Sequence, residues 1–173
     1  MAGGERRMAG SIEIRRLDAT NAITYREIRL EALRARPDAF GGAYEDEREQ
    51  PLEGFADSLV RDAVFGAWHD GALLGIAGFA RLQGKERHKG FLWGMYVREA
   101  ARGSGAADAL VDAVISHART EVESLLLAVG VHNEPAHRLY SRRGFIEYGR
   151  EPRALKAGAI YYDEILMRLD LRR

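Results

Sequence analysis

Hydrophobic and polar residues follow two different periods along this chain of 173 residues, which predicts both strands and helices. In residues 11–17 apolar and charged positions alternate, which indicates an edge strand. In the next segment apolar residues recur three and four positions apart, which predicts a helix capped by Asp18 or Thr20 and ended by Pro37. Its apolar positions are Tyr25, Ile28, Ala32, Leu33 and Ala35.

The middle of the chain carries the pattern of antiparallel strands. Two apolar runs are joined by Asp70-Gly71, the dipeptide that type I′ hairpin turns favour, and a third run follows a charged turn, so we expect a meander. The expected elements in order are an acidic, glycine-bearing loop (38–50), a helix (52–61), two strands (63–69 and 72–82), the charged turn (84–90) and an aromatic-rich strand (91–97).

The second half of the chain predicts a crossover to a parallel strand. Residues 124–131 are almost uninterruptedly apolar, as in a strand that is buried on both faces and joined to a parallel neighbour through a helix. Asn133 is a helix cap, with Pro135 in the first turn and Gly144 beyond the end. A final strand pair, 145–148 and 159–169, is expected around a polar, basic connector.

This order of elements predicts an α/β fold with a mixed, mostly antiparallel sheet and helices on both faces. The length suits a single domain, which we expect over residues 11–173. Residues 1–10 hold two glycine-containing segments and no periodicity, so we expect them to form a disordered leader.

Composition excludes several classes of function. Lysine plus arginine and aspartate plus glutamate both number 26, so no net charge draws the chain to nucleic acid or to an anionic membrane. The absence of cysteine excludes disulfides, thiolate metal sites and a cysteine nucleophile, and the five histidines show no metal-ligand spacing, so no metal is expected. Without an apolar run of membrane-spanning length, a cytoplasmic location is the expectation.

The candidate chemistry begins at a glycine-bearing junction between the strand over 91–97 and the next helix. Gly103 and Gly105 precede the helix, where free backbone amides and the positive end of the helix dipole suit a phosphate. A P-loop would need Gly-Lys-Ser/Thr after Gly105, and a dinucleotide fingerprint would need a glycine at Asp108. The sequence therefore favours another phosphate-bearing ligand.

Two motifs resemble those of the GNAT superfamily of acyl-CoA N-acyltransferases. Arg102-x-x-Gly105-x-Ala107, after a strand ending at Val97, is similar to the acyl-CoA signature, although Ala107 and Asp108 depart from its common form. One strand later, residues 133–145 resemble the second signature of the family. The likeness runs over residues 12–171 and includes Pro37-Asp38-Ala39-Phe40-Gly41 and Tyr161-Tyr162-Asp163-Glu164-x-x-Met167.

This resemblance implies an N-acetyltransferase that uses acetyl-CoA and transfers the acetyl group directly to a primary amine. A backbone amide near residues 95–97 is then the oxyanion donor, and the face of the second-signature helix lines the pantetheine arm. The implied cofactor-binding residues are Met95, Tyr96, Val97, Arg102, Gly103, Ser104, Gly105, Ala106, Ala107, Asn133, Ala136 and Tyr140.

Tyr140 is the candidate catalytic residue. The departing thiolate must gain a proton, and a phenol, with a pKa of about 10, is still protonated at neutral pH. Asn133, Ala136 or His137, and Tyr140 share one helix face because they are spaced by three, four and seven residues. Arg138, Arg142 and Arg143 could reach phosphates or could form a solvated face.

The acceptor site is expected in the acidic loop, since the strand over 91–97 offers no carboxylate as a base. We expect Glu45 or Glu47 to bind or deprotonate a cationic amine, with Phe40 and Tyr44 packed on its apolar part. A non-catalytic acyl-CoA binding module is the main alternative, and an NAD(P)-dependent oxidoreductase is a more distant one. The identity of the amine and the formation of a homodimer stay open.

Overall fold

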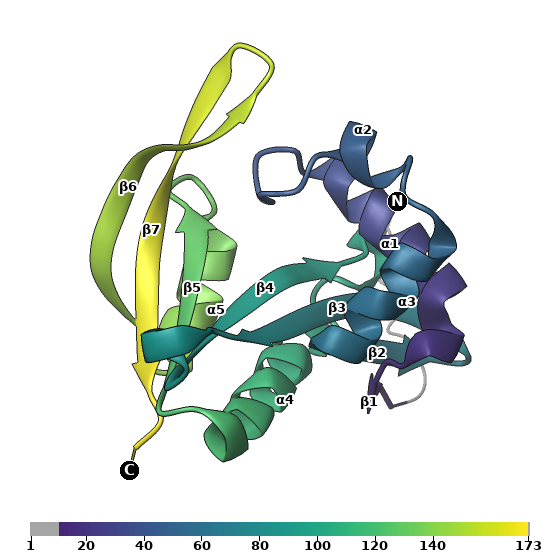
Figure 1. Cartoon of the computed structure of the whole chain (residues 1–173), viewed down its shortest axis with the longest axis horizontal. Coiled ribbons are helices and arrows are strands. Elements are labelled where there is room, and N and C mark those ends of the chain that lie inside the picture. The colour runs from purple at the N-terminus through teal and green to yellow at the C-terminus, as the bar shows by residue number, and fades with distance from the viewer. Residues whose placement is uncertain (1–10, 173) are drawn as a thin grey trace, which may run out of the picture.

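The structure is a computed structural model that describes residues 11–172, so the expected leader lies outside the described residues. Seven strands form one sheet in the order β1-β2-β3-β4-β5-β7-β6 (Figure 1). The strands are β1 (Glu13–Arg16), β2 (Ala63–His69), β3 (Ala72–Arg81), β4 (Lys89–Val97), β5 (Ser124–Gly130), β6 (Ile146–Ala157) and β7 (Ile160–Asp170). The helices are α1 (Ala22–Ala35), α2 (Tyr44–Glu47), α3 (Leu52–Arg61), α4 (Ala106–Glu121) and α5 (Glu134–Arg142), with 3₁₀ turns η1 (Ala19–Asn21), η2 (Gly84–Glu86) and η3 (Glu99–Ala101).

The predicted meander and crossover are confirmed. Strands β2, β3 and β4 pair antiparallel in sequence order, and Asp70 and Gly71 both have positive φ, 48° and 77°, as a type I′ turn requires. Helix α4 then carries the chain across to β5, which pairs parallel with β4. This is the one parallel pairing among residues 11–172, so the sheet is mixed and mostly antiparallel, as predicted.

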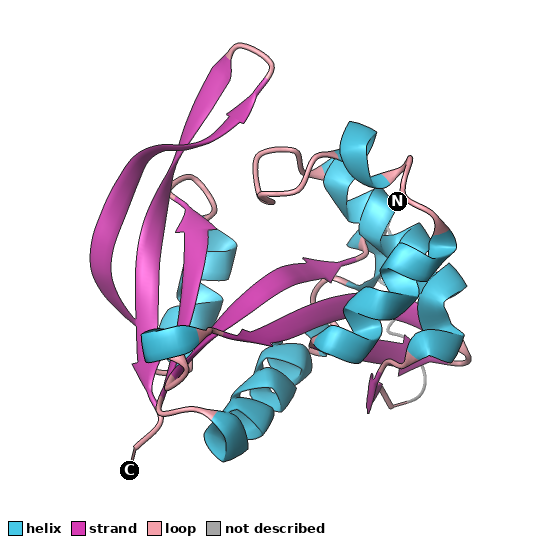
Figure 2. Cartoon of the chain, in the orientation of Figure 1, coloured by secondary structure: helices cyan, strands magenta, loops and turns pink. Residues whose placement is uncertain are grey.

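Helices cover both faces of the sheet and bury two apolar clusters (Figure 2). Helix α4 fills one cluster with Leu110, Val111 and Val114, which are fully buried at its predicted apolar positions. Helices α1 and α3 form the other cluster, with Ile28 and Leu59 at its centre. None of the helices in residues 11–172 combines the length and the apolar character needed to cross a membrane.

The sheet opens between its two central strands. Strands β4 and β5 pair only at their beginnings, where Phe91 opposite Leu126 is the last partnership, and they then diverge (Figure 1). The register of β4 with β3 also shifts between Trp93 and Tyr96, where Gly94 has a φ of 64°. Such a bulge bends the strand and leaves part of its backbone without a sheet partner. The site is built in this opening.

Two predictions about connections were wrong. The polar segment after Tyr148 is not a connector but the continuation of β6, which pairs with β7 up to Ala157 opposite Ile160. Strand β6 is the outermost strand and is mostly exposed, so its residues lack the apolar alternation by which strands are predicted. The loop expected over 38–50 contains the one-turn helix α2.

Candidate active site

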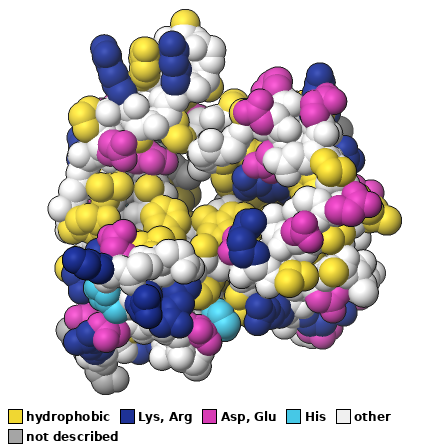
Figure 3. Space-filling model, in the orientation of Figure 1, with side chains coloured by type: hydrophobic (Ala, Val, Ile, Leu, Met, Phe, Trp, Pro, Cys, Tyr) yellow, Lys and Arg dark blue, Asp and Glu magenta, His cyan; other side chains and the backbone are white. Residues whose placement is uncertain are grey.

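Two connected cavities occupy the opening between β4 and β5. We call the first, of about 390 Å³, the aromatic cavity because Phe40, Phe91, Trp93 and Tyr140 line it. The second, of about 330 Å³, is the cradle cavity, which Arg102 and the start of α4 line. In Figure 3 the opening is a hollow with hydrophobic side chains on both sides. The residues that line both cavities are Arg36, Ala39, Phe40, Met95, Asn133 and Ala136.

The glycine turn before α4 has the geometry of an anion cradle. Gly103 and Gly105 have φ of 75° and 88°, and a Cβ at either position would meet no atom within 4 Å, so the backbone is open to a ligand. The Ser104 hydroxyl donates to the Ala101 carbonyl at 2.5 Å and accepts from the Ala106 amide at 3.4 Å, which holds the turn. Within the described chain, the Ala107 amide has no acceptor, as expected in a first helical turn.

The side chains of the cradle residues divide between the cavity and the core. Arg102 and Ala107 line the cradle cavity, whereas Ala106 is fully buried in the core below α4 and can offer only its backbone. Gly103, Ser104 and Gly105 form the turn that leads into the cavity wall. Of the predicted cradle residues, the structure therefore places Arg102 and Ala107 at the cavity wall, whereas Gly103, Ser104, Gly105 and Ala106 lie between them in the chain and line neither cavity.

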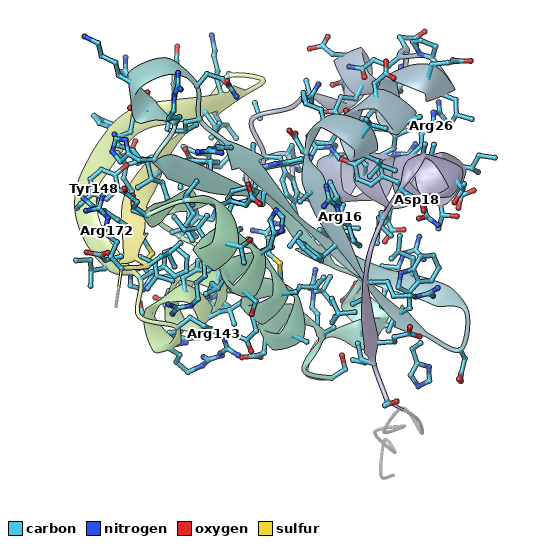
Figure 4. All side chains as sticks on the ribbon, turned by 60° about the horizontal axis from the view of Figure 1, so that its bottom comes forward. Arg16, Asp18, Arg26, Arg143, Tyr148 and Arg172 are labelled. Carbon is cyan, nitrogen blue, oxygen red and sulfur yellow. The ribbon has the colours of Figure 1, made fainter. Side chains whose placement is uncertain are left out.

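Asp108 also lines the cradle cavity, but arginines from α5 neutralise its charge. Its carboxylate pairs with Arg143, which follows α5 (Figure 4), and lies 3.4 Å from Nη2 of Arg142. Nε of Arg143 also lies 3.0 Å from Oδ1 of Asp112. Because Arg142 lines the cavity together with Arg102, this end of the opening stays suited to an anion despite the acid.

The end of β4 lines one side of the opening. Met95, Tyr96 and Val97 line the cradle cavity, beyond the last β5 partner of this strand. The Tyr96 hydroxyl donates to Oε1 of Glu31 at 3.0 Å, and burial raises the pKa of Tyr96. Its side chain is therefore engaged with α1.

One face of α5 forms the other side of the opening, facing the end of β4. Oδ1 of Asn133 accepts a hydrogen bond from the Ala136 amide at 3.4 Å, as predicted for the helix cap. Asn133 and Ala136 both line the two cavities. Tyr140, one turn further, lines the aromatic cavity, and its ring packs edge-on against Phe145 at 5.8 Å. Burial raises the pKa of Tyr140 far above its ordinary value, so the phenol stays protonated. His137 faces elsewhere, with Nε2 2.6 Å from Glu147.

The acidic loop contributes less to the opening than the sequence suggested. Phe40 lines both cavities, but Tyr44, Glu45 and Glu47 line neither. The Tyr44 hydroxyl accepts from Arg34, Glu45 is exposed, and the Glu47 carboxylate accepts two hydrogen bonds from Arg29. The expected contact of these three side chains with an acceptor stays a prediction.

Comparison with known proteins identifies the family. Residues 24–145 match the acetyltransferase (GNAT) family. The chain belongs to this family. Comparison with curated protein sequences found no match.

Solved structures of other GNAT proteins share the fold. A GNAT acetyltransferase from Streptococcus pneumoniae superposes with a TM-score of 0.80 at 20% identity, covering 92% of this chain and 99% of that one. The protein yncA from Salmonella typhimurium, solved with its cofactor acetyl-CoA, superposes with a TM-score of 0.80 at 20% identity. The match covers 94% of this chain and 95% of that one. Ribosomal-protein-alanine N-acetyltransferase from Brucella melitensis superposes with a TM-score of 0.76 at 22% identity. The match covers 91% of this chain and 99% of that one.

Arg29 is a residue of this GNAT site that the sequence did not single out. It lies on the buried face of α1 and lines the aromatic cavity, with its guanidinium carbon 5.7 Å from the ring centroid of Phe40 and 5.8 Å from that of Trp93. A cation directly after the buried Ile28, inside an apolar helix stripe, is the signal that could have revealed it.

A second missed feature joins the two sides of the opening. Asp38, in the loop after α1, lies 3.0 Å from Nη2 of Arg36 and 2.7 Å from Nε2 of His132, which follows β5. Hydrogen bonds from Arg36, and then from His132, hold the pKa of Asp38 well below its usual range. This contact spans 94 residues of sequence, so no local pattern could predict it.

Glu164 on β7 is the third missed residue. It lines the aromatic cavity, and burial, followed by repulsion from Glu151, raises the pKa of its carboxyl group. The sequence motif around it had been noted without a chemical role. In residues 11–172 no three His, Cys, Asp or Glu side chains are arranged to hold a metal ion.

Proposed function

We propose that this protein transfers the acetyl group of acetyl-CoA directly to the nitrogen of a primary amine. The observation that carries the proposal is the continuity of the opening: a phosphate cradle at one end and Tyr140 at the other share a lining of Met95, Asn133 and Ala136. The family and the acetyl-CoA complex of yncA support the choice of cosubstrate.

The cradle fits the pyrophosphate of acetyl-CoA. The open backbone at Gly103 and Gly105 lets phosphate oxygens approach the free amides of α4, and Arg102 and Arg142 add positive charge. The pantetheine arm would then run between the end of β4 and the face of α5. When bound, the thioester supplies an electrophilic carbonyl carbon and a thiolate leaving group.

The residues of the chain supply the remaining chemistry. Unpaired backbone amides at the end of β4 can donate to the oxyanion that forms when the amine attacks. Tyr140 is neutral at physiological pH and holds a proton for the thiolate. The chain has no cysteine, and no other nucleophile is activated in the opening, which favours direct transfer over an acyl-enzyme.

Two measurements test this function. Acetyl-CoA should bind in a calorimetric titration, and thiol release from acetyl-CoA should depend on an added primary amine. Binding with no amine-dependent release across a panel of amines would favour the non-catalytic acyl-CoA module instead. Absence of acetyl-CoA binding would reject both.

A further inference from the structure

We propose, building on the function above, that Glu164 binds the ammonium group of the acceptor and takes its proton. The same observations define the acceptor as a small amine with one positive charge and an apolar body. The sequence predicts a base at Glu45 or Glu47, which line neither cavity, whereas the carboxylate of Glu164 lies inside the opening.

Glu164 lies where a ligand can reach it. In the sheet, Glu164 lies opposite Gly130 of β5 on one side and opposite Glu151 of β6 on the other. Gly130 has no side chain of its own, the imidazole of His132 lies beside it, and Gly130, His132 and Glu164 all line the aromatic cavity. Within residues 11–172 the carboxylate of Glu164 has no hydrogen bond and no ion pair. A partly buried carboxylate without a partner is costly, which is expected where a ligand provides the partner.

The other charges around the aromatic cavity already have partners. Arg29 is paired with Glu47, and Arg36 with Asp38, which also contacts His132. Each of these side chains has a partner of opposite character, whereas Glu164 is the one charged side chain lining this cavity, among residues 11–172, that has none. Glu151, on the neighbouring strand, adds negative potential from the exposed side. The cavity therefore attracts a single positive charge.

The remaining surface of the aromatic cavity suits an apolar group. A volume of about 390 Å³ is that of a small-molecule site. A polyamine would bring further ammonium groups that find no free carboxylate here, and a free amino acid would bring a carboxylate near Glu164. The apolar lining consists of Phe40, Phe91, Trp93, Met95, Val129 and Leu155.

The proton balance follows from the same geometry. Glu164 takes one proton from R–NH₃⁺, and the nitrogen lone pair forms the C–N bond to the thioester carbon. The C–S bond breaks and the thiolate takes the proton of Tyr140. The second proton leaves the nitrogen and restores Tyr140, while Glu164 releases its proton to water. The raised pKa of Glu164 lies closer to the pKa of the ammonium group, so the first proton transfer costs less free energy.

Glu164→Gln tests the assignment, with Asp170→Asn as the control on the same strand, since Asp170 is exposed and lines neither cavity. With phenethylamine as acceptor, we expect Glu164→Gln to lower kcat/KM by about 10²-fold and to remove the acid limb of its pH profile. Asp170→Asn should change kcat/KM by less than about threefold, and Glu164→Asp should retain part of the activity. Calorimetric affinity for acetyl-CoA should be the same in all four proteins.

Acceptor selectivity is measured with the wild-type protein on phenethylamine, spermidine and phenylalanine, and phenethylamine should have the highest kcat/KM. Higher values for spermidine or phenylalanine, or no turnover of phenethylamine, would overturn the acceptor class. An unchanged pH profile in Glu164→Gln would overturn its role as base while the acetyltransferase function stands. Absence of acetyl-CoA binding by the wild type would overturn the function and the inference together.

Discussion

Arg29 of α1 donates two hydrogen bonds to the carboxylate of Glu47 in α2, from Nε at 2.8 Å and from Nη2 at 2.6 Å. Both side chains are largely buried, with 10% and 17% of their surface exposed. The pair holds the short helix α2 against α1 and fixes a guanidinium beside the rings of Phe40 and Trp93. Glu47 therefore acts on the aromatic cavity through Arg29.

Glu47→Gln should lower the free energy of unfolding by about 2 kcal/mol, because Arg29 would keep a buried charge without its carboxylate. Glu45→Gln is the control, since Glu45 is exposed on the same helix and should change stability by less than about 0.5 kcal/mol. Chemical denaturation of both variants measures the difference. Equal unfolding free energies would show that the pair adds nothing to stability.

Gly105→Glu should abolish acetyl-CoA binding while the fold survives, because it adds a negative side chain where the backbone meets the pyrophosphate. Gly105→Ala separates charge from backbone strain: it has the same unfavourable φ of 88° but points only a methyl group into open space. We expect Gly105→Ala to retain measurable affinity by calorimetry. Wild-type affinity in Gly105→Glu would place the pyrophosphate elsewhere.

Tyr140→Phe should lower kcat by about 10²-fold, with little change in the affinity for acetyl-CoA. The ring and its contact with Phe145 remain, so the loss reports on the hydroxyl alone. Steady-state kinetics with thiol detection and a parallel calorimetric titration distinguish these effects. Undiminished turnover would assign protonation of the thiolate to water or to another group.

Asp38→Asn should destabilise the protein at neutral pH, and by progressively less as the pH falls below about 4. The folded pKa of Asp38 is lowered, so its contribution is present above the unfolded pKa of about 3.9 and is lost as the pH falls through the folded value. Thermal unfolding of wild type and variant from pH 2 to pH 8 should therefore show a difference in Tm that is steady above about pH 5 and shrinks as the pH falls below about 4. A constant difference in Tm over this range would argue against the ionic contact.

Glu164→Gln should be at least as stable as the wild type at pH 7. The folded pKa of Glu164 is raised, so its ionisation costs stability as the pH rises from the unfolded pKa of about 4.3 through the folded value. The neutral amide removes that cost, and the gain should vanish below about pH 4. A lower Tm of the variant at pH 7 would indicate a structural role for the carboxylate.

The sequence alone determined the elements that rest on local interactions. The hairpin at Asp70-Gly71 depends on backbone preferences of two adjacent residues, and the cap at Asn133 on a contact three residues away. Helix α4 follows from the spacing of its apolar residues. The glycine turn before α4 belongs to the same class, since the conformational freedom of glycine and the free amides of a helix start are properties of a short segment.

Only the tertiary structure decided which charged residues belong to the site. In the sequence Glu45, Glu47 and Glu151 are acids in polar surroundings and Glu164 follows another acid, so any of them could be solvated. The register of β7 with β5 and β6 brings Glu164 beside Gly130 and opposite Glu151, while the packing of α2 on α1 commits Glu47 to Arg29. Burial and pairing set the energy of a charge, and both depend on residues that are far apart in the chain.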